Sequence, residues 1–458
     1  MSLEAAIAVH RFGLGARPGE MDRADRTPKA WLMSQLDRGA DQPQSLDGTS
    51  LMAGGALVAE MVAYQRERVM ARQNGDQTDP VKEFFKSRVG LYMKEMAARF
   101  ALGFTTQRPF AERLVHFWSN HFVVSAQNPR ATTVVGAFER EAIRPNIHRT
   151  FEDMLLAAMQ HPAMLLYLDN AQSVGPDSLG GMTSRRGLNE NLGRELMELY
   201  TLGVDGGYTQ ADVVAMAKLL TGWTIDRKGQ GENGFFYARA IHEPGSFALR
   251  GKSYASGWDG TVAAIKDLAR DPATARHVAR KFAVHFIQDT PSEESCARLE
   301  KTFVQTNGDL KALAETAVND PQAWRAENAK MRSPVEYVTA AFRLVGWPKG
   351  GDTQKQVRSA MSATRIMGEF PLAAPSPKGW PDTSDAWSGP DAILNRVEWA
   401  EALGEKMQAT LAAADVARLA EDAMGPLANA TTLSAIRRAS SGGEALALLV
   451  SSPEFQRR

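Results

Sequence analysis

Hydrophobic residues recur along most of the chain at steps of three and four, which is the period of an α-helix rather than of a strand. Ala, Leu, Met, Arg and Glu, which favour helices, dominate most windows. Several helix starts are marked by a polar residue directly before proline, because proline at the first helical position gives up an N–H that has no partner there. These pairs are Asp79-Pro80, His161-Pro162, Asp271-Pro272, Asp320-Pro321 and Ser452-Pro453. The pattern predicts a mainly α protein.

Two stretches interrupt this helical pattern. Residues 223–260 are rich in glycine, and the Glu-Pro-Gly-Ser segment at 243–246 has the central Pro-Gly of a type II turn. We therefore predict a small β-hairpin insertion near residues 235–254, with His242 at its tip. Residues 368–390 are rich in proline and contain two tryptophans, Trp380 and Trp387. They predict a long Pro/Trp loop, which the tryptophans favour as an ordered one.

Composition narrows the classes of function. The chain has 458 residues with 53 Lys+Arg and 53 Asp+Glu, so it lacks the net positive charge that favours nucleic acid, and we expect no such partner. Its one cysteine, Cys296, excludes an internal disulfide framework and cysteine-rich zinc or iron–sulfur sites. We find no nucleotide or haem signature. No segment approaches about 18 consecutive apolar residues, so we expect no membrane span. The first residues lack the features of a signal peptide, which predicts a cytoplasmic protein.

Residues 108–125 contain the first candidate site. His121 follows Phe110, Leu114 and Phe117 on one face of a predicted helix, so it points where the core residues point. A buried imidazole needs a hydrogen bond, a carboxylate or a metal, because desolvating it without a partner is costly. His121 is therefore either a core histidine bonded to a backbone carbonyl or a catalytic residue. Its neighbour Asn120 is a candidate for orienting a substrate, and His116 is predicted to face solvent.

Residues 188–203 contain the second candidate site, on a helix whose apolar stripe is formed by leucines. Glu195 lies at the edge of this stripe, where burial would raise its pKa, so we predict that it is a general base or a metal ligand with His121 as its partner. The candidates for orienting the substrate are Glu190, Asn191, Arg194 and Glu198. The alternative is that the charged residues form ordinary surface ion pairs.

Two further histidines are considered. His242 is the third catalytic candidate, provided that the tip of the hairpin reaches a cleft. His285 aligns with Val278 and Phe282 on one helical face and is predicted to pack in the core. The chain has no G-x-S-x-G, H-E-x-x-H or P-loop motif, so any metal would be held by His and Glu side chains and its identity is unknown.

Eight blocks of sequence together resemble one family, the bacterial domain of unknown function 1800 (DUF1800). They are residues 11–15, 117–122, 189–199, 202–212, 220–223, 242–245, 330–336 and 379–381. The resemblance covers nearly the whole chain and implies a large, mostly helical protein. Because the blocks follow in one order, we predict that residues 1–458 form one large helical-bundle-like unit. Its coarse parts are N-terminal helices (1–180), a motif helix with a capping loop and the hairpin (181–260), and C-terminal helices (261–458).

The resemblance also implies a partner. Genes of the family often neighbour those of the DUF1501 family, whose members resemble sulfatase- or phosphatase-like enzymes, and relatives of both kinds are often exported. Our first hypothesis is therefore an accessory protein that works with such an enzyme. The second is a hydrolase, with or without a metal, whose His/Glu site lies between the helices containing residues 118–121 and 189–198. The third is a buried polar network that is purely structural. His285 stands where the family pattern has a large apolar or aromatic residue, so we assign it no chemistry.

Overall fold

The computed structural model describes residues 1–73, 80–183, 186–348 and 352–458. Helices dominate these residues, which confirms the prediction of a mainly α protein. The α-helices are α1 (Leu3–Ile7), α2 (Glu20–Asp25), α3 (Pro28–Met33), α4 (Gly54–Gln73), α5 (Pro80–Thr105), α6 (Pro109–His121), α7 (Val135–Phe138), α8 (Phe151–Gln160), α9 (Pro162–Tyr167), α10 (Asn191–Glu195), α11 (Gln210–Leu220), α12 (Trp258–Ala269), α13 (Pro272–Phe286), α14 (Glu293–Gln305), α15 (Leu310–Asn319), α16 (Pro334–Leu344), α17 (Thr353–Ile366), α18 (Pro390–Met407), α19 (Ala413–Met424), α20 (Ala430–Arg438) and α21 (Gly442–Ser451). The strands are β1 (Trp223–Ile225), β2 (Phe235–Tyr237), β3 (Ser246–Leu249) and β4 (Lys252–Ala255).

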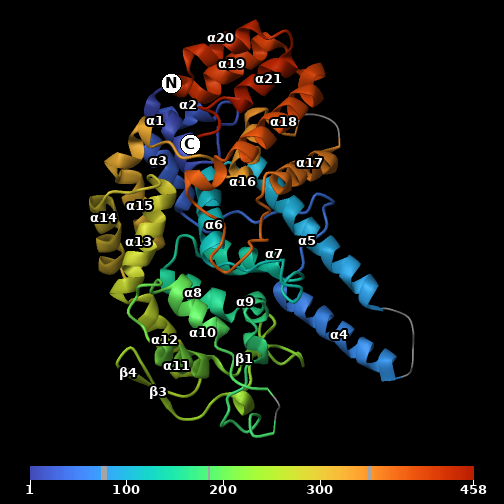
Figure 1. Ribbon diagram of the computed structural model, residues 1–458, viewed down its shortest axis with the longest axis vertical. Helices are drawn as coiled ribbons and strands as arrows, with labels where there is room; N and C mark the ends of the chain where they lie inside the picture. Colours follow the sequence, from blue (N-terminus) through green and yellow to red (C-terminus); the bar gives the residue numbers. More distant parts are fainter. Residues whose placement is uncertain (74–79, 184–185, 349–351) are drawn as a thin grey trace.

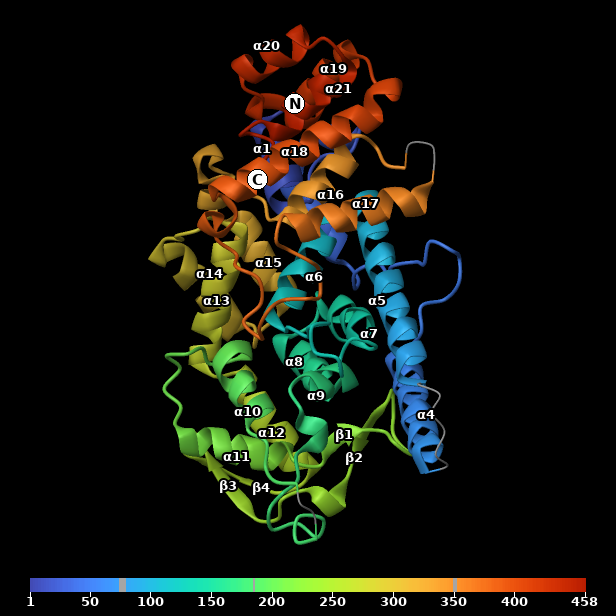
Figure 2. The same ribbon diagram turned by 45° about the vertical axis from the view of Figure 1, so that its right-hand side comes forward.

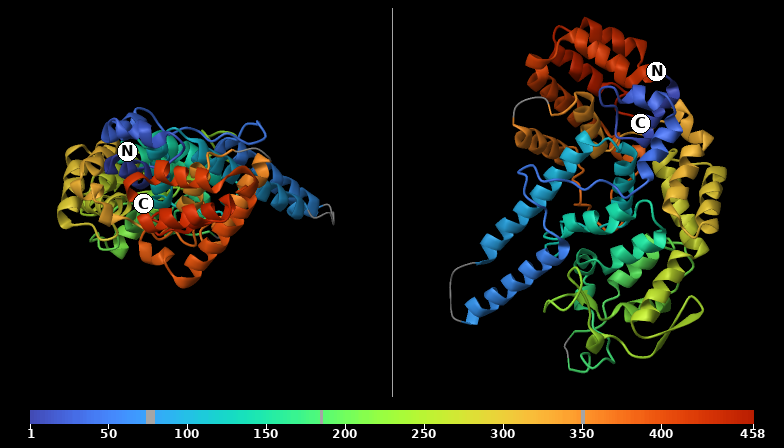
Figure 3. Two further views of the ribbon diagram at one scale, coloured as in Figure 1. Left: turned by 90° about the horizontal axis from the view of Figure 1, so that it is seen from above. Right: turned by 180° about the vertical axis from the view of Figure 1, so that it is seen from behind.

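The elements are arranged along one long axis (Figures 1 and 2). Helices α18 to α21 lie at one end, and α11, α12 and the strands lie at the other. Helix α6 lies between these ends, while α4 and α5 extend away from the rest as two long helices, as Figure 3 shows from behind. Among the described helices, none combines the length and the apolar character that crossing a lipid bilayer requires.

The polar-proline pairs mark helix starts in most cases. Helices α9 and α13 begin at Pro162 and Pro272, and the preceding His161 and Asp271 accept a hydrogen bond from the first turn. Pro321 begins a short 3-10 helix with Asp320 as its cap. The prediction at Ser452-Pro453 is wrong, because Ser452 caps the end of α21 and the residues after it form a turn. Helix α5 begins at Pro80, and Asp79 lies outside the described residues.

The predicted hairpin of residues 235–254 is wrong in its pairing. Strand β2 pairs with β1, which precedes it in the sequence, and β3 pairs with β4. Two separate antiparallel hairpins therefore form. The turn between β3 and β4 is Arg250-Gly251, whose φ angles of 52° and 77° fit the type I′ turn that closes short hairpins. A 3-10 helix, Arg239–Ile241, follows β2, so β2 does not continue to the turn at Pro244-Gly245. His242 consequently lies between the two hairpins, at the tip of neither.

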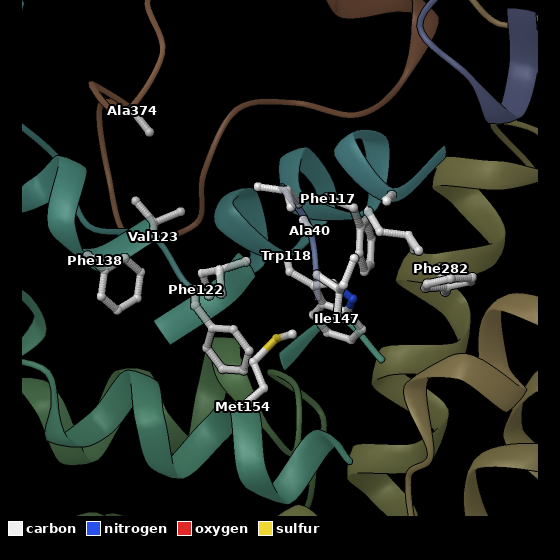
Figure 4. Close-up of a cluster of buried hydrophobic side chains, with 14 of the residues drawn as sticks. Ala40, Phe117, Trp118, Phe122, Val123, Phe138, Ile147, Met154, Phe282 and Ala374 are labelled. Carbon is white, nitrogen blue, oxygen red and sulfur yellow. The ribbon is translucent and has the colours of Figure 1, made fainter. Parts of the chain in front are cut away.

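The core around α6 is aromatic. Figure 4 shows Phe117 and Trp118 of α6 beside Phe282 of α13, and Phe122 close to Met154 of α8. The Phe117 and Phe282 rings lie edge to face with centroids 5.1 Å apart, an arrangement that aromatic pairs favour. These contacts fix α6 against α13, two helices that carry several of the residues considered below.

Charged groups are buried in pairs elsewhere in the core. Arg343 and Glu20 are both 0% exposed, and the guanidinium binds the carboxylate at 2.8 and 2.9 Å. Arg144 binds both oxygens of Glu112 at 2.7 Å and also Glu139 at 2.8 Å. Such groups are tolerated because each charge has a partner, and removing one partner would leave the other uncompensated. These pairs tie distant parts of the chain together.

The long loop between α17 and α18 is ordered, as the tryptophans predicted. It descends from α17 beside α6 and returns to α18 (Figures 1 and 2, orange). Trp387 is buried and its indole N–H donates to the carbonyl of Pro381 at 3.2 Å. A short 3-10 helix, Ser384–Trp387, interrupts it.

Candidate functional site

A cavity of about 610 Å³ lies where α6, α13 and the loop of residues 368–389 meet. The π-helical turn Leu196–Tyr200 and the start of α16 complete its walls. Four of the eight histidines of the chain line it, namely His116, His121, His277 and His285. The cavity therefore gathers residues that are far apart in the sequence and that can exchange protons.

His121 has its side chain in the position that the sequence predicts, on the buried face of α6 and 2% exposed. Its Nε2 donates to the carbonyl of Tyr200 at 3.0 Å, so Nδ1 carries the lone pair and accepts from the Nζ of Lys281, also at 3.0 Å. Burial, with the nearby Lys281 charge, holds the pKa of His121 well below its usual value. His121 is therefore neutral, bonded to a carbonyl on one side and to a lysine on the other.

His116 does not face solvent, so the prediction for it is wrong. Its side chain is 14% exposed, and its Nε2 lies 3.6 Å from Glu112. Glu112 in turn is held by Arg144 in the buried network described above. The face of α6 that looked polar in the sequence is covered by the segment that contains Arg144, which a helical projection of α6 alone could not show.

Glu195 is the last residue of α10, and burial followed by the charge of Glu198 raises its pKa, in the predicted direction. The lining residues of the cavity include Glu198 and not Glu195. The helix does not continue regularly through residues 188–203, because the turn Leu196–Tyr200 is π-helical. Asn191 and Glu195 lie on the regular α-helical part, and Glu198, in the wider turn, is close enough for its charge to act on Glu195.

The other residues of that segment lie towards the surface. Arg194 and Glu190 pair at 2.9 Å with both side chains more than a third exposed, which matches the alternative of an ordinary surface ion pair. Asn191 is exposed. Of the eight predicted site residues, the cavity brings together His121, Asn120 and Glu198.

His242 has two backbone partners. Its Nδ1 donates to the carbonyl of Thr221 at 2.6 Å, and its Nε2 accepts from the N–H of Gly257 at 2.6 Å. Both ring nitrogens are therefore engaged in holding the segments around the hairpins. The residue is buried and is not part of the cavity lining.

Asn120 holds the loop above the cavity. Its amide nitrogen donates to the carbonyl of Trp380 at 2.9 Å, and its amide oxygen accepts from the N–H of Trp380 at 2.8 Å. Gly379, the preceding residue, has a φ of 87°, and a Cβ there would lie 2.6 Å from the Oδ1 and from the backbone oxygen of Asn120. The two segments can approach this closely only because residue 379 has no side chain.

We expect Gly379→Ala to lower the free energy of unfolding by about 1–3 kcal/mol and to loosen the loop, because alanine is strained at this φ and would clash with Asn120. Chemical denaturation and hydrogen exchange of residues 368–389 would measure both effects. Gly389→Ala is the matched control, because Gly389 ends the same loop with φ −62° and has no heavy atom within 4 Å of a built Cβ. Equal effects of the two substitutions would contradict the expectation.

The sequence interpretation missed a histidine–aspartate pair. The Nδ1 of His285 donates to the Oδ2 of Asp382 at 2.7 Å, and its Nε2 has no hydrogen-bond partner. Burial lowers the pKa of His285 to about 4, so the ring is neutral. Burial alone would raise the pKa of Asp382, but His285 and Lys330 hold it low and keep the carboxylate ionised. His285 thus packs as predicted, beside Phe117 and Phe286, while its polar edge is bound to a carboxylate.

A second missed group is Glu369, at the start of the loop. Burial raises its pKa to about 7, although its carboxylate accepts hydrogen bonds from the N–H of Val335 at 2.8 Å and from Ser333. It lines the cavity, as do Val335 and Ser333. Glu369 is therefore a carboxyl group that gains and loses a proton near neutral pH.

Glu336 anchors the cavity wall on the side of α16. One carboxylate oxygen accepts from Arg113 of α6, and the other accepts from the Nε of Arg458 at 3.0 Å. Burial alone would raise the pKa of Glu336, but the two arginines hold it well below its usual value. Arg458 also donates to the carbonyl of His285 at 2.9 Å, so this network fixes the histidine as well.

Some signal for these residues is present in the sequence. Glu336 ends the block of residues 330–336, and Asp382 directly follows the block of residues 379–381. Neither block by itself indicates a partner, because the groups that meet them lie on other helices. Among the described residues, no group of three or more His, Cys, Asp or Glu side chains is arranged to hold a metal ion.

Comparison with known proteins gives a family and no characterised relative. Residues 7–457 match the model of one family, described as "Protein of unknown function (DUF1800)". A search of curated proteins and a search of solved structures each found no match. The family match spans nearly the whole chain, as the sequence blocks predict. The chain belongs to the DUF1800 family.

Proposed function

We propose that this protein is an enzyme that acts on a small organic molecule by general acid–base catalysis in the central cavity, with hydrolysis as the reaction class. The observation that supports it is that one cavity contains both a carboxyl group with a pKa near 7, Glu369, and a histidine oriented by a carboxylate, His285. The volume of about 610 Å³ is that of a small-molecule pocket. This retains the predicted hydrolase and assigns its acid and base to other residues.

His285 would serve as the base. Asp382 accepts the Nδ1 proton of its ring, which places the lone pair on Nε2. This nitrogen is buried and has no other partner, so a water molecule has to be admitted beside it before it can take a proton as that water attacks the substrate. The carboxylate of Asp382 would stabilise the imidazolium that forms, which offsets the low proton affinity that burial gives the ring.

Glu369 would serve as the acid. With a pKa of about 7, a large fraction of its carboxyl groups carry a proton at neutral pH and can donate it to the leaving group. The N–H of Val335 fixes one carboxyl oxygen, so the group is held in one orientation. After the step the water has lost a proton to His285 and the leaving group has gained one from Glu369.

The accessory role beside a DUF1501 enzyme stays a prediction, and we favour the enzyme because of the cavity. The structural alternative applies to a different set of residues. Arg144 forms ion pairs with Glu112 and Glu139 in the core, as a network that only fixes helix packing would. The groups of the cavity instead include an acid with a raised pKa, Glu369, and a histidine bound to a carboxylate, His285.

We expect the protein to consume at least one compound when it is incubated with a bacterial metabolite extract. Mass spectrometry of the extract over time would measure this consumption. Glu369→Gln and His285→Gln should each slow this consumption by about 10²–10⁴-fold, because each removes a proton-transfer group. Glu401→Gln, an exposed substitution on α18, is the control and should leave the rate unchanged. An extract that the wild type leaves unchanged, or a Glu369→Gln variant as fast as the wild type, would contradict the proposal.

A further inference from the structure

Lys281 has an unusual place on α13. Residues 277, 281 and 285 follow at steps of four, so they share one face of the helix, and all three line the cavity. Lys281 lies between His277 and His285 along the helix, and its Nζ is 3.0 Å from the Nδ1 of His121. A lysine is thus directed at the cavity with two neutral histidines as its neighbours.

Among the described residues, partly buried Lys281 has no carboxylate within ion-pair distance, in contrast to Lys330, which is buried beside the same site. Lys330 lies 3.2 Å from a carboxylate oxygen of Asp289 and 3.6 Å from one of Asp382. In the described part of the chain, no carboxylate comes within ion-pair distance of Lys281, whose polar contact is the hydrogen bond with His121. An ammonium group in such a place is costly, because the surrounding protein removes water and Asp382 acts on it only from beyond ion-pair distance.

The charged groups that face Lys281 come from three elements. Two belong to the loop: Asp382 raises the pKa of Lys281, and Lys378 lowers it. His121 of α6 and His277 of α13 are neutral, because burial lowers their pKa values. Burial is the largest influence on Lys281 and, with Lys378, lowers its pKa to about 8. At neutral pH about a tenth of its side chains would then be free amine, which is the nucleophilic form.

We propose that Lys281 captures a carbonyl compound, an aldehyde or a ketone, as an imine in this cavity. The proposal shares with the proposed function only the assumption that the cavity binds the substrate. It requires no proton transfer by Glu369 or His285. It adds the substrate class, because only a carbonyl carbon forms a C=N bond with an amine in this way.

The contacts of Lys281 suit this reaction. The free amine can donate one N–H to His121 and keep its lone pair for the carbonyl carbon. As the C–N bond forms, the Nδ1 of His121 can take a proton from the nitrogen and return it to the former carbonyl oxygen. In the whole reaction both protons of the amine leave with that oxygen as water, and the C=N bond remains. Tyr200 holds the other ring nitrogen of His121 throughout.

Reductive trapping of the wild-type protein tests this. We would incubate it at pH 7 with benzaldehyde and sodium cyanoborohydride, whose hydride reduces an imine to a stable secondary amine, and map benzyl adducts by peptide mass spectrometry. We expect Lys281 to be labelled at least ~30-fold faster than exposed Lys301, because an ordinary lysine with pKa near 10.4 has under ~0.1% free amine at this pH. Labelling of Lys281 should reach half its maximal rate near pH 8.

Lys330 is the second internal control, because it is buried but paired with carboxylates, and it should stay unlabelled. Labelling of Lys281 no faster than of Lys301 would overturn the proposal, and this measurement requires no variant to fold. Lys281→Arg, checked for folding by circular dichroism, should remove the dominant adduct. Glu369→Gln should keep it. If that variant loses turnover and keeps the adduct, both proposals are supported. An adduct on a protein that consumes no metabolite supports the imine alone.

Discussion

Replacing Glu336 by glutamine is expected to lower the free energy of unfolding by about 3–5 kcal/mol. The carboxylate lies between the guanidinium groups of Arg113 and Arg458, each only 1% exposed. Glutamine has nearly the same shape but no charge, so two buried cations would lose their shared partner. The cost is that of an uncompensated buried charge, which exceeds the loss of an ordinary hydrogen bond.

The contribution of Glu336 to the free energy of unfolding should depend on pH in a defined direction. The pKa of Glu336 is depressed in the folded protein, so its contribution is present above the unfolded-state pKa near 4.5 and is lost as the pH falls through the folded value. Urea denaturation of wild type and variant should therefore differ most at pH 7 and less in acid. Glu315→Gln, at an exposed position of α15, should change the stability by less than about 0.5 kcal/mol. A loss below about 1 kcal/mol for Glu336→Gln would contradict the network described above.

Replacing Glu369 by glutamine is expected to have the opposite effect and to raise the free energy of unfolding at pH 8 by about 1–3 kcal/mol. Burial raises the folded pKa from 4.5 to about 7, so the folded protein binds more protons than the unfolded chain between these values. Wild-type stability should consequently fall as the pH rises through that window. Glutamine resembles the protonated acid, can still accept from Val335 and carries no charge to desolvate.

Denaturation at pH 4.5 and pH 8 would measure this, with Glu401→Gln as the control. The gain should be largest at pH 8 and nearly absent at pH 4.5, where the wild-type carboxyl group is protonated in the folded state. A variant less stable than the wild type at pH 8 would show that the carboxylate is structural. Higher stability together with lost turnover is typical of a residue kept for function.

The sequence predicts well what is local. The inward direction of His121 follows from the helical period within the 13 residues of α6. The sequence predicts poorly which segments pair with each other and where a helix departs from the regular α-helical period. Residues 235–237 pair with residues 223–225, and a π-helical turn forms at residues 196–200. Neither choice is visible in periodicity.

The cavity is the least predictable feature, because its proposed acid and base, Glu369 and His285, come from segments far apart in the sequence. Glu369 and Asp382 sit in a loop that the sequence marks only by proline and tryptophan, and their properties arise from burial against α6, α13 and α16. The DUF1501 partner, the cytoplasmic location and the single unit of residues 1–458 stay predictions.

The spacing of residues along α13 makes this helix a molecular ruler. Lys281 and His285 are one turn apart, so their side chains leave the axis about 6 Å from each other along it. A carbonyl carbon held at Lys281 would leave the next few bonds of the same molecule beside His285. The helix itself would then select a chain length, since the cleaved bond has to lie a fixed number of atoms from the carbonyl group.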